Sequence, residues 1–245
     1  MSSKRKNKYA LDINDYKICK SIKKGAFGIV YEIKNKTTNK RFAAKVIPTA
    51  DSEQAKQTID GEIRIMVKFS HPTMSNFIGF SNVDFDGNDN ITIIMELAEK
   101  GSLFDVLKSV KNGLAEDKYD NTARQIILVG ISYGMMQLHQ NRVMHRDLKP
   151  GNILIDESFH PRITDFGLSK IYELDHSKSQ SKDCGTPGYM APEVINGDSN
   201  SWKADVYSFS IIMYEVITDL KPFPLFEKNF FQLNQKIVND NYRPQ

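Results

Sequence analysis

The sequence has few cysteines and no long hydrophobic run. Among 245 residues only Cys19 and Cys184 are cysteines, and neither belongs to a CxxC pair or a histidine-rich cluster. The sequence therefore indicates neither a disulfide framework nor a zinc site, and a reducing environment fits it. No stretch of 18 or more apolar residues occurs, and no apolar run follows the charged N-terminus, so we expect no transmembrane segment and no secretory signal. A cytoplasmic location is the expectation, with entry into the nucleus left open.

Neither sign of charge dominates the chain. The 33 basic and 30 acidic residues give a formal net charge of +3, so we expect no nucleic acid partner and no membrane insertion. The visible basic cluster is SSKRKNK, residues 2–8, in a segment 1–14 that we interpret as a flexible tail. A nuclear-import or lipid-binding signal is the alternative for that cluster. Hydrophobic residues make up 40% of the chain, which is enough to bury a sizeable core and excludes disorder of the whole chain.

The chain from about residue 15 to 97 favours β-strands. Short runs rich in β-branched or aromatic residues are separated by turn residues, and they predict strands over 16–22, 28–34, 41–47, 76–83 and 91–97. One helix is expected among them, over residues 54–69. Its apolar residues share one helical face: Ile59, Ile63, Met66 and Val67. Gly61 lies inside this helix and should cost about 1 kcal/mol relative to alanine.

After residue 100 the pattern becomes helical. Helical periodicity predicts helices over 102–110 and 122–140, and the stretch 205–218 is apolar nearly all round, which favours a buried helix. A strand-rich unit is thus followed by a helix-rich one. The segment LAEKGS, residues 97–102, is the expected hinge between them.

The stretch DFDGNDN resembles the start of a calcium loop and fails as one. Asp84, Asp86 and Asn88 occupy its first, third and fifth positions, but Asp89 replaces the glycine needed at the sixth and Met95 the glutamate needed at the twelfth. We therefore expect a hairpin turn.

Two glycines in KKGAFG, Gly25 and Gly28, have the spacing of loops that fold over nucleotide phosphates. Lys23 stands where the fuller pattern has a third glycine, so the hexapeptide by itself favours an ordinary turn between strands over a phosphate-binding loop. A dinucleotide-binding fingerprint is excluded, because that motif needs a helix after the glycines and here the strand-like GIVYEI follows.

Two downstream motifs are far more specific. HRDLKPGN at 145–152 and TDFGLSK at 164–170 resemble the catalytic loop and the metal-binding loop of the eukaryotic protein kinases. Seven positions of the first motif match, which chance would give at roughly one in a billion starting points. Further kinase-like motifs appear in the same order as in the family, FAAKVI at 42–47 and GTPGYMAPE at 185–193.

The resemblance covers about residues 15–245 and implies an α+β, two-lobed protein-kinase-like fold. Its small β-rich N-lobe with one main helix would span 15–96, its hinge 97–102 and its mostly helical C-lobe 103–245. The implied activity is an ATP- and Mg²⁺-dependent protein kinase, in which the protein mainly positions the reactants and neutralises charge.

By the same resemblance, each motif residue has a task in phosphoryl transfer. Lys45 would pair with the α- and β-phosphates of ATP, and Glu62 would hold Lys45 in place. Asp147 would accept the proton of the substrate hydroxyl, while Lys149 would neutralise the γ-phosphate. Asn152 and Asp165 would hold magnesium.

The resemblance also implies a set of residues around the nucleotide, comprising the glycine-rich hairpin, the walls of the adenine pocket and the hinge backbone. These residues are Ile22, Gly25, Gly28, Val30, Ala43, Lys45, Glu96, Ala98 and Leu154. Others look architectural: His145 is expected to stack with Phe166, and Asp205 to cap backbone around the catalytic loop.

Two features favour serine and threonine as acceptors. Lys149 and the GTPGY run resemble serine/threonine kinases, and GTPGYMAPE with residues 205–218 looks most similar to the tyrosine-kinase-like group. Thr186 is expected to bridge Asp147 and Lys149, with a phosphorylation site as the alternative. Protein substrates and ATP are the expected partners.

Arg146 suggests control by phosphorylation. A phosphate placed by an upstream kinase on Ser177, Ser179 or Ser181 could pair with Arg146 and order the segment before GTPGY. A serine-rich polar loop without such a role is the alternative.

The sequence departs from the family at residue 245. The family continues through two more helices, one of which carries an arginine that pairs with the residue equivalent to Glu193, so we expect an incomplete C-lobe of low stability. The alternative function is therefore a weakly active or inactive kinase-like module that binds nucleotide or partners.

Overall fold

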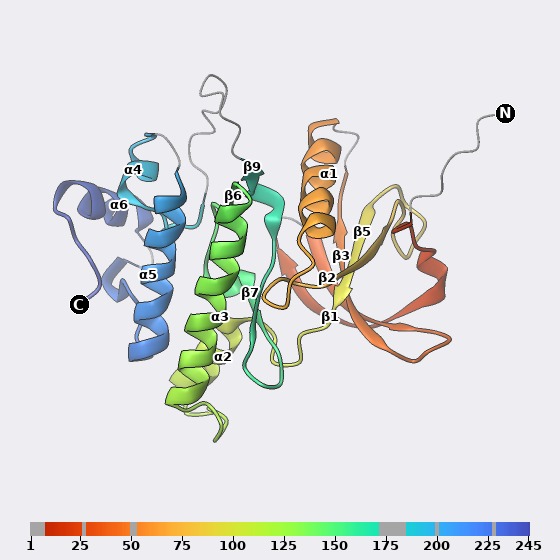
Figure 1. Ribbon diagram of the computed structural model, residues 1–245, viewed down its shortest axis with the longest axis horizontal. Coiled ribbons are helices and arrows are strands. Elements are labelled where there is room, and N and C mark those ends of the chain that lie inside the picture. Colours follow the sequence, from red (N-terminus) through yellow and green to blue (C-terminus); the bar gives the residue numbers. More distant parts are fainter. Residues whose placement is uncertain (1–7, 26–27, 50–52, 172–184, 199–200, 227–228) are drawn as a thin grey trace. The chain divides into compact units, whose positions relative to one another are not determined.

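The computed structural model describes residues 8–25, 28–49, 53–171, 185–198, 201–226 and 229–245. The chain divides into two compact units, residues 1–98 and 99–245. The first contains the five-stranded sheet and one helix, and the second contains the remaining helices (Figure 1). The expected α+β class, with strands first and helices after, is confirmed.

The sheet of the first unit is antiparallel throughout, with strand order β1-β2-β3-β5-β4. Its strands are β1 (Tyr16–Gly25), β2 (Gly28–Asn35), β3 (Arg41–Ile47), β4 (Phe77–Ser81) and β5 (Ile91–Glu96). All five predicted strands are present. The 3₁₀ turn η1 (Ile13–Asp15) leads into β1.

One face of this sheet covers a buried core. Its members are aliphatic or aromatic side chains from η1 and four strands: Ile13, Tyr16, Ile33, Phe42, Ala44 and Ile94. The rings of Tyr16 and Phe42 meet edge to face at 5.9 Å. Burying a large apolar side chain stabilises the fold by about 1.5–3 kcal/mol, so this cluster gives the sheet much of its stability.

Helix α1 (Glu53–Lys68) is where the apolar periodicity predicted it. Ile59 and Met66 are buried, at 3% exposure each. A methyl group added at Gly61 would meet no atom within 4 Å, so this glycine has no packing reason to be there.

The DFDGNDN stretch is a turn, as expected. The Asp84 carboxylate accepts hydrogen bonds from the backbone N–H groups of Asp86 and Asn88, and from the amides of Asn88 and Asn90. Burial alone would raise the pKa of Asp84, but these hydrogen bonds outweigh it and lower the pKa to about 2. The acidic residue therefore serves the turn itself.

The second unit is built mainly of helices. They are α2 (Leu103–Lys111), α3 (Asn121–Gln140), α4 (Pro192–Ile195), α5 (Trp202–Thr218) and α6 (Phe230–Asn239). Its strands form two short antiparallel pairs, β6 (Val143–Met144) with β9 (Lys170–Ile171), and β7 (Ile153–Ile155) with β8 (Pro161–Ile163). Its 3₁₀ turns are η2 (Pro150–Asn152), η3 (Phe166–Leu168) and η4 (Pro224–Phe226). None of the helices in the described part of the chain could cross a bilayer, since none combines the necessary length and apolarity.

Polar caps decide where the two long predicted helices begin. Ser102 and Asp105 form a reciprocal capping box at the start of α2. At the start of α3 the Asp120 carboxylate accepts a hydrogen bond from the Ala123 N–H at 2.9 Å. Such caps contribute about 1 kcal/mol each, and the two helices begin within one residue of the starts expected from periodicity, 102 and 122.

Helix α5 differs from its prediction. Ile212 and Val216 are fully buried, but Val206, Met213 and Ile217 are 58%, 38% and 59% exposed. The expectation of a buried helix therefore holds for one face of α5 and not for the other. Average apolarity cannot distinguish the two faces of a helix, and only packing shows which face is covered.

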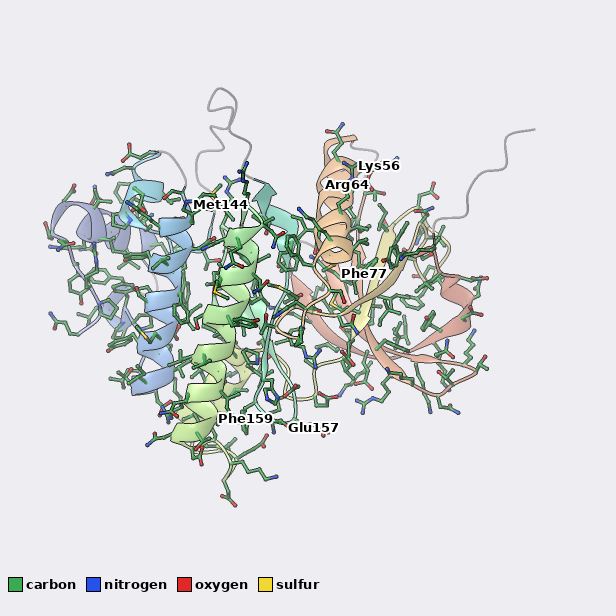
Figure 2. All side chains as sticks on the ribbon, viewed as in Figure 1. Lys56, Arg64, Phe77, Met144, Glu157 and Phe159 are labelled. Atoms are coloured by element: carbon green, nitrogen blue, oxygen red, sulfur yellow. The ribbon has the colours of Figure 1, made fainter. Side chains whose placement is uncertain are left out.

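The hairpin of β7 and β8 positions the segments that follow and precede it. Figure 2 shows Glu157 and Phe159 at the turn of this hairpin. Phe159 is buried and has a positive φ of 64°. Its ring packs on Tyr119 at 5.8 Å and lies under the Lys100 ammonium at 4.7 Å. These contacts hold the hairpin in place. Asn152 immediately precedes its first strand, and Asp165 lies two residues after its second strand.

Candidate active site

The loop 145–152 is held by one buried carboxylate from α5. Asp205, 2% exposed, accepts hydrogen bonds from the backbone N–H groups of His145 at 2.9 Å and Arg146 at 2.8 Å. His139 Nε2 lies 2.9 Å from the same carboxylate. Burial alone would raise the pKa of Asp205, but His139, His145 and the backbone donors hold it below its ordinary value. The predicted capping role of Asp205 is confirmed.

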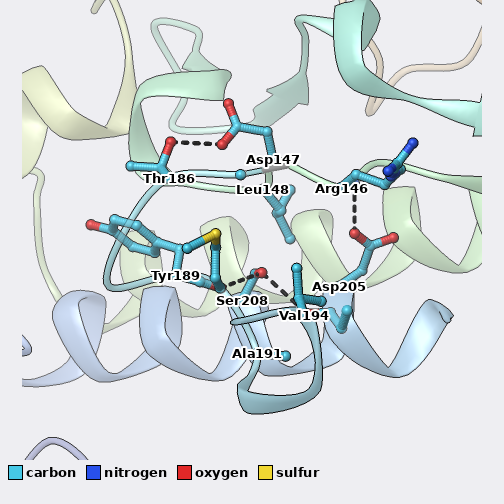
Figure 3. Close-up of a pocket in the computed structure, with 12 residues that line it drawn as sticks. Arg146, Asp147, Leu148, Thr186, Tyr189, Ala191, Val194, Asp205 and Ser208 are labelled. Carbon is cyan, nitrogen blue, oxygen red and sulfur yellow. Dashed lines mark hydrogen bonds between the residues drawn. The ribbon is translucent and has the colours of Figure 1, made fainter. Parts of the chain in front are cut away.

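Three polar side chains meet beside this loop. The Thr186 hydroxyl donates to Asp147 Oδ1 at 2.6 Å and accepts from the Lys149 ammonium at 2.6 Å. Lys149 also donates to Asp147 Oδ2 at 2.7 Å. Figure 3 shows Thr186 reaching Asp147 from the segment that ends at α4. The predicted bridge by Thr186 is confirmed, although 39 residues separate it from Asp147.

Asn152 and Asp165 are brought together by the β7–β8 hairpin. Ile153 pairs with Ile163, and the Thr164 N–H donates to the Asn152 carbonyl at 3.0 Å. The Asn152 amide group donates to the Asp147 carbonyl at 2.9 Å and to Asp147 Oδ2 at 3.1 Å. One carboxylate and one amide oxygen are thereby placed at neighbouring ends of two paired strands.

This pair of residues is suited to a hard cation that also binds phosphate oxygens. Among the described residues no group of three or more His, Cys, Asp or Glu side chains could hold a metal ion by itself. Both Asn152 donor contacts go to Asp147, so its amide oxygen is the atom left for a cation. Magnesium binds through one or two protein oxygens plus substrate phosphates and waters, and Asp165 with Asn152 fits that ligand set.

Two of the seven non-glycine residues with a positive φ in the described part of the chain lie at the same place. Arg146 and Asp165 have positive φ values of 70° and 65°, which non-glycine residues rarely adopt. Each costs of order 1–3 kcal/mol and persists only where surrounding contacts enforce it. Here the bonds to Asp205 and the β7–β8 pairing supply those contacts.

His145 has an architectural position. It is fully buried, its Nε2 lies 3.0 Å from the Thr164 carbonyl, and its ring is 5.7 Å from that of Phe166. The expected contact with Phe166 is confirmed.

In the first unit, β3 and α1 contribute an ion pair. The Lys45 ammonium lies 2.9 Å from Glu62 Oε1, and the two side chains are 12% and 2% exposed. An ion pair so well shielded from water fixes the direction of the lysine side chain. The sequence predicted this partnership across 17 residues.

The expected nucleotide residues of β2 and β3 share one sheet face. Val30 is directly opposite Lys45, and Ala43 lies two residues along β3, opposite Glu32. Met95 of β5 is the neighbour of Ala43 on the other side. Side chains two residues apart on a strand point the same way, so Val30, Ala43 and Lys45 line one surface.

Comparison with known proteins decides the family. Residues 16–243 match the protein kinase domain family. The chain belongs to this family. Relatives include "Protein kinase 2" of Dictyostelium discoideum, 33% identical over 96% of this chain and 46% of the relative, and "Serine/threonine-protein kinase AtPK1/AtPK6" of Arabidopsis thaliana, 34% identical over 94% and 47%. "Dual specificity protein kinase shkB" of Dictyostelium discoideum is 33% identical over 90% of this chain and 33% of the relative. The chain spans less than half the length of each of these three relatives.

Gly25 and Gly28, the two glycines of KKGAFG, are glycines for different physical reasons. Gly28 has a φ of 120°, and a Cβ there would lie 2.0 Å from the Val46 carbonyl oxygen, so only glycine fits. A Cβ on Gly25 would meet nothing within 4 Å, so its side is open. Gly25 pairs with Gly28 at the end of the β1–β2 hairpin, while Lys23 pairs with Val30 inside it.

Glu215 is, after Asp205, a second buried carboxylate of α5 that holds a neighbouring segment, and the sequence did not predict this role. The Tyr189 hydroxyl donates to Glu215 Oε1 at 2.5 Å, and Ser208 Oγ donates to the Tyr189 carbonyl at 2.7 Å. Burial is the main reason why the pKa of Glu215 is raised, and burial followed by Glu215 raises that of Tyr189. Both contacts tie the segment after Thr186 to α5. No local pattern marks them, because 26 residues separate Tyr189 from Glu215.

The remaining expected residues are placed as follows. Ile22 is exposed in β1, Glu96 ends β5 and Ala98 follows it, all in the first unit, whereas Leu154 lies in β7 of the second. Ser177, Ser179 and Ser181 lie outside the described residues.

Proposed function

We propose that the chain transfers the γ-phosphate of ATP to serine or threonine hydroxyls of protein substrates, in a magnesium-dependent reaction. The observation that carries this proposal is the joint position of Asp147, Lys149 and Asn152 on one loop that Asp205 holds. Phosphoryl transfer uses a carboxylate to orient the acceptor hydroxyl, an ammonium to neutralise phosphate charge and an amide oxygen to bind a metal ion, and this loop supplies all three groups.

The residues would divide the work by their charges. Asp147, whose carboxylate is already aligned by Thr186 and Lys149, would orient the substrate hydroxyl and accept its proton. Lys149 would neutralise charge on the transferred group, and Lys45, held by Glu62, would bind the other phosphates. Magnesium bound by Asp165 and Asn152 would neutralise the phosphate charge that develops during transfer.

We also propose which residues contact the nucleotide. They are the residues inferred from the family resemblance: Ile22, Gly25, Gly28, Val30, Ala43, Lys45, Glu96, Ala98 and Leu154. The open side of Gly25 and the shared face of Val30 and Ala43 support this assignment.

Serine and threonine are the proposed acceptors. The support is the contact between Thr186 and Lys149 and the names of relatives described as serine/threonine-protein kinases. Placement in the tyrosine-kinase-like group rests on GTPGYMAPE and residues 205–218. Because one relative is named a dual specificity kinase, the acceptor test must include tyrosine.

The test is a transfer assay on purified residues 1–245. The protein is incubated with magnesium-ATP and a mixture of Ser, Thr and Tyr peptides, beside Asp147→Asn and a matched control, Asp117→Asn, in the exposed loop before α3. Loss of a general base reduces transfer by about 10²- to 10⁴-fold, so Asp147→Asn should fall by at least 100-fold while the control stays within two-fold. Equal transfer by the Asp147 variant would contradict the proposal.

A thermal-shift measurement with ATP, with and without magnesium, distinguishes the alternative. Protein that is stabilised by magnesium-ATP but transfers to no peptide would be a nucleotide-binding module instead of an enzyme. Transfer to tyrosine alone would contradict the proposed acceptors.

A further inference from the structure

Basic side chains are concentrated in the first three strands. Residues 16–41 contain eight lysines or arginines and one acidic residue, Glu32. The rest of the chain then holds 25 basic and 29 acidic residues, from totals of 33 and 30. The small net charge of the whole chain therefore conceals a basic region in β1–β3 and a slightly acidic remainder.

Two irregularities in β1 bring three lysines onto one face. Lys17, Lys20 and Lys23 are three residues apart, so they would alternate between faces in a regular strand. The β1–β2 register shifts between Ile18 and Lys20 and again between Ser21 and Lys23. The three lysines consequently stand opposite Lys34, Glu32 and Val30, which are two apart on β2 and share one face.

The basic face continues into the interior of the sheet. Lys17 pairs with Lys34, and Lys34 pairs with Arg41, so three cations lie side by side across β1, β2 and β3. Like charges directly opposite each other destabilise a sheet. Glu32 offsets part of this charge, with Arg41 Nε at 2.7 Å and Lys20 Nζ at 3.5 Å. We call this set, Lys17, Lys20, Lys23, Lys34 and Arg41 around Glu32, the basic face.

Protection of a sheet edge explains only part of this arrangement. Lysines and bulges on an edge strand prevent unwanted strand pairing, and β1 is an edge strand (Figure 1). Lys34 and Arg41, however, lie on β2 and β3, which are paired on both sides and need no such protection. Their charges require another explanation.

The surroundings of the basic face favour a hydrophilic protein partner. Its cross-strand rows contain no aromatic residue on which a nucleotide base could stack. Exposed Ile18, which could enter a membrane, stands opposite Ile33 and therefore points to the other face. Carboxylates of an extended peptide recur about 7 Å apart at alternate residues, which matches the spacing between successive rows on β2.

We propose that the basic face binds an acidic segment of a protein, with Asp or Glu at alternate positions. Lys20 and Arg41 are 68% and 57% exposed, so both remain reachable beside Glu32. Lys34 is four residues from Val30 along β2, about 13 Å, whereas Lys23 stands directly opposite Val30, so only the Lys34 end of the surface is distant from the proposed nucleotide residues. Binding should weaken with salt, because exposed charges are screened.

The test uses residues 1–245 and a fluorescein-labelled twelve-residue peptide of alternating glutamate and serine, with a glutamine version as the neutral probe. The test variant is Lys17→Glu with Lys34→Glu. The matched control is Lys24→Glu with Lys40→Glu, which changes the charge equally on the other face: Lys24 pairs with Ile29, and Lys40 lies over Phe42. Fluorescence anisotropy at two salt concentrations measures the Kd.

The test variant should bind at least ten-fold more weakly than the unchanged protein, and the control within two-fold. Equal losses in both would show attraction by net charge alone and would overturn the proposal, as would equal binding of the glutamine peptide. Tighter binding to phosphatidylserine vesicles or to a twelve-nucleotide single strand would also overturn it. Lys17→Gln with Lys34→Gln replaces the test variant if circular dichroism shows that it is unfolded. ATP is absent throughout, so the outcome is independent of kinase activity.

Discussion

Replacing Lys45 by methionine should destabilise the first unit strongly. Glu62 is 2% exposed and its Oε1 lies 2.9 Å from the Lys45 ammonium, so the variant leaves a carboxylate buried without that cation. Removing one partner of a buried ion pair costs about 3–5 kcal/mol, and we expect about 3 kcal/mol, because Lys45 itself is 12% exposed. Methionine keeps nearly the volume of the lysine stem, so packing should contribute little.

The assay is urea unfolding at pH 7, followed by fluorescence and circular dichroism. In the double variant Lys45→Met with Glu62→Gln the buried charge is gone, so most of the loss should be recovered, to within about 1 kcal/mol of the unchanged protein. The control is Lys20→Met, because Lys20 pairs with Glu32 at 3.5 Å from a 68% exposed position and should change stability by less than about 0.5 kcal/mol.

Two results would refute this reasoning. One is a loss below about 1 kcal/mol for Lys45→Met, which would mean that water or another donor compensates Glu62. The other is a double variant as unstable as Lys45→Met alone. That result would show that the loss of stability comes from the missing lysine side chain and not from the unpaired charge of Glu62.

Three further predictions follow from single residues. Gly61→Ala should stabilise α1 by about 0.5–1 kcal/mol, since the added methyl meets no atom, and an unchanged or lower melting temperature would contradict it. Asp205→Asn should lower the free energy of unfolding by about 2–3 kcal/mol and reduce phosphate transfer, because an amide has one acceptor oxygen where the carboxylate uses two for the His145 and Arg146 N–H groups. Urea unfolding and the peptide assay measure these effects, and a change in stability below about 0.5 kcal/mol would count against the prediction. Asp84, with its pKa lowered to about 2 from an ordinary 3.8, stabilises the fold above pH 4 and loses that contribution as the pH falls toward 2. Solvent screening limits this contribution to about 1 kcal/mol, and Asp84→Asn should remove the corresponding slope from stability measured between pH 5 and 2.

The elements of the fold were predictable where local pattern and local capping agree. The five strands, α1 and the starts of α2 and α3 follow from short-range features, such as the apolar spacing of Ile59 and Met66 and the cap at Ser102. Short elements such as α4 and the β6–β9 pair escaped prediction. They contain two to four residues and depend on partners elsewhere in the chain.

The candidate site was predictable as a set of residues and only partly as a geometry. The motifs 145–152 and 164–170 indicated which residues carry charge, but Tyr189 with Glu215 was missed because no motif contains both. The outer face of α5 was also misjudged, since apolarity alone placed Val206 and Ile217 inside.

By itself, the sequence determined the order of strands and helices and the identity of the chemical groups, because both depend on neighbours a few residues away. The tertiary structure alone decided the contacts across long separations. Tyr189 reaches Glu215 over 26 residues, and Lys17, Lys20 and Lys23 share a face only because the β1–β2 register shifts twice. Such arrangements depend on packing and strand register. Contacts from the whole chain contribute to the free energy that decides between alternative packings and registers, so a local sequence pattern does not reveal them.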